Sequence, residues 1–130
     1  MNQRIISHVA VYLLSVVMII FGIYHFQQPR LFVTWVPTFL PGGIVWVYVV
    51  GVAFILAALA FISNKFVKLA GYLLAALLII FVLTVHLPTY RNAGVLEERQ
   101  IAFTNLLKDL ALAAFALHIA GSADSLGVKY

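Results

Sequence analysis

The sequence predicts an all-α membrane protein built as an antiparallel bundle of four transmembrane helices. Of its 130 residues, 65% are hydrophobic and only 9% are charged, whereas soluble domains are about half apolar and about a quarter charged. The apolar residues form four runs, each close to the roughly 20 residues that cross a bilayer as a helix. None of the runs alternates with a period of two, so they are predicted to be helices and not strands.

The four runs are expected at about residues 5–26, 43–62, 66–87 and 96–120, within a single domain of residues 1–130. Because the connections are short, neighbouring helices are expected to be antiparallel. The first run is too long for the apolar part of a signal peptide, and no small-residue cleavage site follows it. Small residues four apart mark candidate helix contacts in lipid. They are Gly71 with Ala75, and Ala53 with Ala57.

The connection QQPRLFVTWVPTFLPGG between the first two runs is predicted to form an interfacial cap. Its prolines, including Pro37 and Pro41, interrupt regular helix, and the segment is too apolar to lie in water. Trp35 favours the headgroup region of a bilayer. The segment either covers the outer end of the bundle or acts only as an interfacial anchor, and the sequence leaves this open.

Both termini are expected in the cytoplasm, and the location is expected to be a bacterial cytoplasmic membrane. An even number of spans places both ends on one side. The basic residues of that side are Arg4, Lys65, Lys68 and Lys129. Those of the other side are Arg30, Arg91 and Arg99. The side with more lysine and arginine in short loops is the cytoplasmic one.

Five polar side chains are expected to meet in one layer of the outer half of the bundle. They are His25, His86, Asn105, Lys108 and Asp109. At ~100° per residue, the last three share one helix face. A charge at the centre of a span costs roughly 2.5–3.5 kcal/mol, so this face is expected to point inward. As sequence neighbours, Lys108 and Asp109 are expected to diverge, with Asp109 held by a histidine or a tyrosine of another helix.

This layer has two interpretations, which the residues leave open. It is either a structural knot that fixes helix register or a pocket that binds a ligand or moves protons. Haem is not favoured, because His118 lies about 180° from Asp109 around its helix and the chain contains no cysteine for a covalent attachment motif. No metal-binding or hydrolase motif is present in the sequence, and no metal site is expected.

The order of the segments GIYHF, PRLFVTWVPTFLP, VHLP and NLLKDLALAA resembles the DoxX family of small four-helix membrane proteins, from about residue 22 to residue 120. The resemblance implies a quinone-linked or redox-associated membrane subunit. The residues to which it points are His25, Pro37, Pro41, His86, Asn105, Lys108 and Asp109.

On this hypothesis the polar layer binds a quinone. Lys108 or a histidine would bind a quinone carbonyl, while Asp109 or His86 would handle protons. Trp35, Trp46 and Tyr48 would contact the ring and the isoprenoid tail.

A non-enzymatic chaperone, assembly factor or scaffold is the alternative, in which the polar layer matches polar groups of a client helix. The expected partners are membrane lipid and another membrane protein, and homo-oligomerisation is left open. Nucleic acid is not expected, because the basic residues form no patch.

Overall fold

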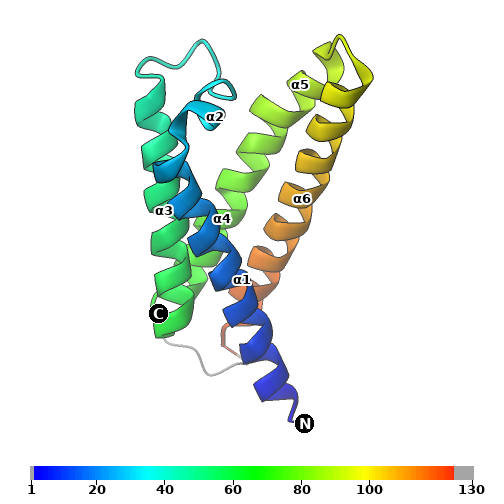
Figure 1. The fold of residues 1–130 in the computed structure, drawn as a ribbon. Helices are drawn as coiled ribbons and strands as arrows, with labels where there is room; N and C mark the ends of the chain where they lie inside the picture. The colour runs from blue at the N-terminus through cyan, green and yellow to red at the C-terminus, as the bar shows by residue number, and fades with distance from the viewer. Residues whose placement is uncertain (1, 125–130) are drawn as a thin grey trace.

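The computed structural model describes residues 2–124, which are almost entirely helical and include no strand (Figure 1). Its long helices are α1 (Gln3–Gln27), α3 (Ile44–Ser63), a third helix of three segments, and α6 (Leu96–Gly121). The three segments are α4 (Val67–Phe81), a π-helical turn η1 (Val82–His86) and α5 (Leu87–Asn92). All four helices are long and apolar enough to cross a membrane, which confirms the all-helical prediction at this level.

Small residues bring the helices together in pairs. α1 packs along α3, and α4 packs along α6. A Cβ atom on Gly22 would lie 2.9 Å from the carbonyl oxygen of Gly51, so the α1 and α3 backbones are in direct contact there. A Cβ atom on Gly71 would lie 2.9 Å from the carbonyl oxygen of Ala116 in α6. Close backbone approach at small residues is the usual way for helices to associate in lipid.

The small residues that the sequence marked as candidate contacts have different surroundings. Ala75 is buried, Ala57 belongs to the core, and Gly71 is a helix contact. Ala53 instead lines a cavity that is described below.

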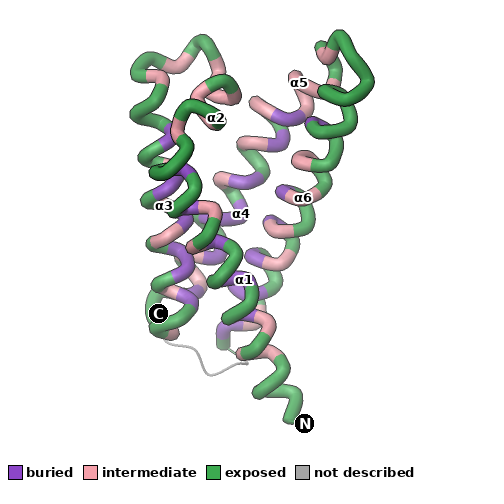
Figure 2. Tube along the Cα trace, in the orientation of Figure 1, coloured by how far each residue is buried: buried purple, intermediate pink, exposed green. Residues whose placement is uncertain are grey.

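The hydrophobic core occupies the half of the bundle that contains the start of α1 and the end of α6. Its members include Leu14 and Met18 of α1, Phe61 of α3, Leu74 of α4 and Ile119 of α6. Figure 2 shows the buried residues crowded into this half, whereas the other ends of the helices spread apart. Within residues 2–124, α1 and α6 do not pack along their lengths, although the other three sides of the bundle do.

The outer faces of the helices are strongly apolar. Leu13 of α1, Leu56 of α3 and Leu73 of α4 each expose about three-fifths of their surface (64%, 60% and 61%). Soluble monomers rarely expose such large continuous apolar surfaces. These faces are therefore suited to contact with lipid tails.

The connection between α1 and α3 begins with the short helix α2 (Pro29–Val33) and continues as turns to residue 43. Pro29 starts α2, where a missing N–H is harmless. Gly42 and Gly43 both have positive φ angles, which glycine adopts without steric cost, and they turn the chain into α3. The indole Nε1 of Trp46 donates to the carbonyl oxygen of Pro41 at 2.6 Å and holds this turn against α3.

The third long helix widens into η1 just before Pro88 and continues through α5 to Asn92, beyond the end at residue 87 that the sequence predicted. A proline cannot donate to the carbonyl four residues earlier, and its ring clashes with that carbonyl. The π-turn removes this conflict, because the N–H of Leu87 donates to the carbonyl of Val82, five residues back. A π-turn also rotates the side chains that follow it, and His86 is its last residue.

Candidate functional site: an apolar cavity with one polar wall

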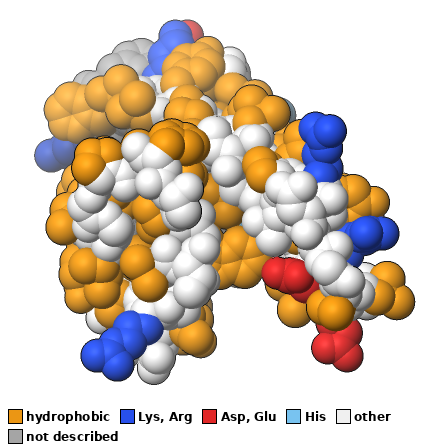
Figure 3. All heavy atoms as spheres, turned by 90° about the horizontal axis from the view of Figure 1, so that it is seen from above, with side chains coloured by type: hydrophobic (Ala, Val, Ile, Leu, Met, Phe, Trp, Pro, Cys, Tyr) orange, Lys and Arg blue, Asp and Glu red, His pale blue; other side chains and the backbone are white. Residues whose placement is uncertain are grey.

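A cavity of about 510 Å³ lies between the spread ends of the helices, within the range of small-molecule sites. Every long helix contributes to its lining, and so does the connection between α1 and α3. The aromatic lining residues are Phe21, Phe32, Trp35, Phe39, Trp46, Phe54 and Phe81. Viewed from the end that carries this connection, the molecule is hollowed, with apolar side chains inside and charged side chains at the rim (Figure 3).

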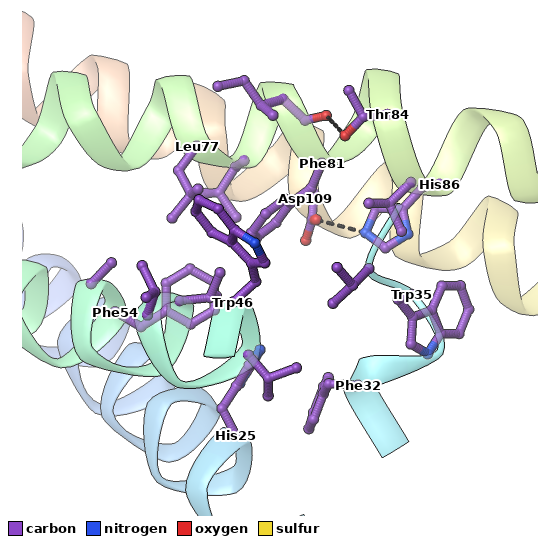
Figure 4. A pocket seen from close by; sticks show the side chains of 18 of the residues that line it. His25, Phe32, Trp35, Trp46, Phe54, Leu77, Phe81, Thr84, His86 and Asp109 are labelled. Atoms are coloured by element: carbon purple, nitrogen blue, oxygen red, sulfur yellow. Dashed lines mark hydrogen bonds and ion pairs between the residues drawn. The ribbon is translucent and has the colours of Figure 1, made fainter. Parts of the chain in front are cut away.

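The polar wall of the cavity centres on His86 and Asp109. His86 Nε2 lies 2.8 Å from Asp109 Oδ2, and both residues are buried (Figure 4). A carboxylate accepts hydrogen bonds, so Nε2 is the protonated ring nitrogen. The other nitrogen, Nδ1, is buried and has no hydrogen-bond partner within residues 2–124. The π-turn thus presents a histidine that has one satisfied and one unsatisfied nitrogen.

Lys108 links this polar wall to α1. Its Nζ lies 3.5 Å from Asp109 Oδ1 and 4.6 Å from the centre of the Phe21 ring. The first contact corrects the expectation that the two neighbouring side chains diverge, since the long lysine side chain bends back to the carboxylate. The second is a cation–π contact, which gains strength away from water. Because Phe21 belongs to α1, Lys108 bridges the unpacked side of the bundle.

His25 lies on the opposite wall and does not bind Asp109. Its Nδ1 donates to the carbonyl oxygen of Phe21 at 2.6 Å, so in the neutral ring Nε2 is the nitrogen that can accept. The ring stacks on Phe32, with centroids 4.0 Å apart, and meets Phe54 edge-on. His25 is therefore fixed among aromatic rings.

The remaining predicted site residues take different positions. Asn105 lines the cavity, and its side chain forms no hydrogen bond in the described part of the chain. Trp35 and Pro37 also line the cavity, and the Trp35 ring meets His86 edge-on at 5.9 Å. Pro41 does not line the cavity, and its carbonyl oxygen accepts from Trp46 Nε1 in the turn before α3. Tyr48 stacks on Phe26 and does not line this cavity.

Sequence reasoning did not identify Phe21, Phe32 and Phe54 as site residues. One signal was present, because Phe21 precedes His25 by four residues and therefore shares its helix face. No comparable signal marked Phe54, since α3 is apolar on all sides. His8 and His118 do not line the cavity. No cluster of three or more metal-ligating side chains occurs among the residues that the structure describes.

The fold and the cavity define a class of helical proteins with four membrane-length helices around an apolar pocket. Residues 14–120 match a family described as "Domain of unknown function (DUF8561)", and the chain belongs to this family. All the residues that line the cavity fall within this range. No curated protein and no solved structure matches the chain.

The resemblance to the DoxX family was wrong, because the family that matches is a different one. Its segments were a histidine near a helix end, prolines in a connection and a polar step in an apolar helix. None of these segments is a specific motif by itself, so their order did not identify the family.

Proposed function

We propose that this protein is an integral membrane protein that crosses the bilayer four times as an antiparallel bundle, with both termini in the cytoplasm. The lipid-like outer faces and the helix lengths support the spans. The short turn between α3 and α4 carries Lys65, and Lys68 follows at the start of α4, which supports the orientation. Lys129 belongs to the same argument but lies outside the described residues.

Cysteine labelling tests this topology without background, because the chain has no cysteine. Ser63→Cys is nearly isosteric and exposed, and a Cβ atom at Gly94 meets nothing within 4 Å. In intact cells, a membrane-impermeant maleimide should label Gly94→Cys but not Ser63→Cys. In inverted vesicles the pattern should reverse. Labelling of both positions from one side would rule out the antiparallel arrangement.

We further propose that the cavity binds a lipophilic molecule with one polar end, and that an isoprenoid quinone is the first candidate. The observation that carries this proposal is the buried His86–Asp109 pair with an unpartnered nitrogen, placed on a wall of an otherwise apolar and aromatic cavity. Pockets of this composition use a few polar groups to orient a mainly apolar ligand. Nδ1 of His86 is the acceptor of this neutral ring, and a buried acceptor without a partner is costly. The hydroxyl of a quinol can donate to it, whereas a quinone carbonyl can only accept.

Quinone chemistry matches the polar groups of this wall. Quinone reduction and quinol oxidation require protons to move to and from ring oxygens. A histidine oriented by a carboxylate is a common proton carrier, and Lys108 can donate a hydrogen bond to a carbonyl. Within this proposal the chain is the quinone-handling subunit of a membrane redox assembly, and another protein supplies the electrons.

Native mass spectrometry of the protein released from its own membranes tests the binding function. The wild type should retain a mass that matches an isoprenoid quinone. His86→Leu and Asp109→Leu should lose that mass while remaining folded. The matched control is His118→Leu, which removes an exposed histidine of α6 outside the cavity. A retained polypeptide in place of a small molecule would favour an assembly factor or scaffold.

A further inference from the structure

We propose that the ligand of this cavity has an uncharged polar end and reaches the cavity from the lipid, through the side of the bundle between α1 and α6. This inference rests on the proposed binding function. It adds the charge state of the ligand's polar end and the route by which the ligand enters the cavity.

The charges of the cavity wall balance without a ligand. Lys108 and Asp109 are the only Lys, Arg, Asp or Glu side chains that line it in the described part of the chain. They lie 3.5 Å apart, so each already has its counter-charge. A carboxylate or phosphate head would add a net negative charge beside buried Asp109. Such a charge is costly to remove from water when no partner remains for it.

The hydrogen bonds left over in the cavity suit a neutral head. Nδ1 of His86 has no partner, and Nε2 of His25 is an acceptor in the neutral ring. The side-chain amide of Asn105 can both donate and accept. Both ring nitrogens are acceptors, so a hydroxyl group can donate to them, whereas a carbonyl or ester can only accept from Asn105 or Lys108. None of these groups adds charge. Hydroxyl or carbonyl ends of membrane-dissolved molecules therefore match the wall better than ionised ones.

The route follows from the one unpacked side of the bundle. α1 with α3, α3 with α4, and α4 with α6 all pack, whereas α1 and α6 do not pack along their lengths within residues 2–124. The cavity reaches this side, because Phe21 of α1 and Lys108 of α6 both line it. Their cation–π contact bridges the two helices at that level. Lys108 is 40% exposed, so it can swing away without breaking a packed core.

Tryptophan fluorescence can test both parts, because the only two tryptophans, Trp35 and Trp46, line the cavity. Both tryptophans are kept as reporters, because the indole of Trp46 also holds the turn before α3. The protein is reconstituted in vesicles, and two probes with the same brominated chain are delivered from other vesicles. One probe is a fatty-acid methyl ester, and the other is the fatty acid held ionised at alkaline pH.

If the ligand must be uncharged, the ester should quench the cavity tryptophans saturably, and the apparent affinity for the ionised acid should be lower by about tenfold or more. Non-specific quenching from bulk lipid is linear in probe and is subtracted. Equal or tighter saturable binding of the ionised acid would overturn this part of the proposal.

The route is tested by blocking the side between α1 and α6. Phe21→Cys is labelled with a bulky lipophilic maleimide and compared with the same variant unlabelled. The matched control is labelled Ile20→Cys, the next residue of α1, whose side chain faces outward and does not line the cavity. Label at position 21 should slow ester quenching roughly tenfold, because access then requires a conformational change. Label at position 20 should leave the rate unchanged.

The outcomes separate the proposals. Saturable quenching at an unchanged rate in labelled Phe21→Cys would overturn the lateral route while leaving the binding function intact. If neither the ester nor an isoprenoid quinone gave saturable quenching in any variant, the binding function itself would fail. Gel filtration and circular dichroism of each labelled protein verify that the fold is retained.

Discussion

At the scale of single residues, Asp109 is the side chain on which the polar wall depends. It accepts from His86 through Oδ2 and faces the ammonium of Lys108 through Oδ1. Only 3% of Asp109 is exposed, whereas the Lys108 side chain is 40% exposed. The histidine pair is therefore shielded from solvent, and the lysine pair is partly screened. Most of the stabilisation from Asp109 should come from His86.

Asp109→Leu should lower the free energy of unfolding by about 3 kcal/mol, because it leaves His86 Nε2 without an acceptor and Lys108 without a counter-charge. The double variant His86→Leu/Asp109→Leu should be less destabilised than the sum of the two single variants, because the partners are removed together. Reversible unfolding in mixed micelles measures both quantities.

Asp124→Asn is the control for these variants, since its carboxylate is 74% exposed and lies 3.8 Å from Lys68 at the surface. Exposed pairs of this kind contribute about 0–1 kcal/mol. If the effects of His86→Leu and Asp109→Leu were strictly additive, the two residues would not act as a pair.

At the scale of elements, Gly71 sets the distance between α4 and α6. Gly71→Ala should destabilise the protein by about 1–3 kcal/mol, because the new Cβ would lie 2.9 Å from both Ala116 O and Ala120 Cβ. Gly121→Ala, at the end of α6, meets nothing within 4 Å and should be neutral or slightly stabilising. Thermal unfolding of the two variants gives the comparison. Equal melting temperatures would contradict the close approach.

The elements also show what sequence reasoning can and cannot reach. Hydrophobic run lengths predicted four apolar helices, because the free energy of lipid contact acts on each run independently. The π-turn before Pro88 was not predicted, although the proline itself signals that the preceding helix must adjust. Phe54, which lines the cavity from α3, was also missed, since its position depends on which face of α3 turns inward. An apolar helix such as α3 carries no pattern that identifies this face.

The same limit applies to the candidate site. The convergence of His25, His86 and Asp109 on one cavity follows from helix ends and depth. The hydrogen-bond partner of each residue cannot be predicted from helix ends and depth, because hydrogen bonds depend on side-chain rotamers and on the rotation that η1 introduces. The contact of Lys108 with Asp109 is one example, because it depends on the rotamer of the lysine side chain.

At the scale of the whole molecule, the bundle is packed at one end and spread at the other (Figures 1 and 2). The end with the start of α1 holds the core, and the opposite end holds the cavity. The hydrophobic core and the cavity are thereby separated along the helix axes. Substitutions in the cavity half should perturb binding more than folding, apart from those that break the Asp109 pair.

This asymmetry has a mechanical consequence in a bilayer. A bundle that is narrow in one leaflet and wide in the other displaces unequal areas of lipid in the two leaflets. Lipids with small headgroups fill the space beside the narrow end, whereas a tightly compressed opposite leaflet would press the spread helices together. Under the membrane topology proposed above, the volume of the cavity would therefore depend on the lateral pressure of the membrane around it.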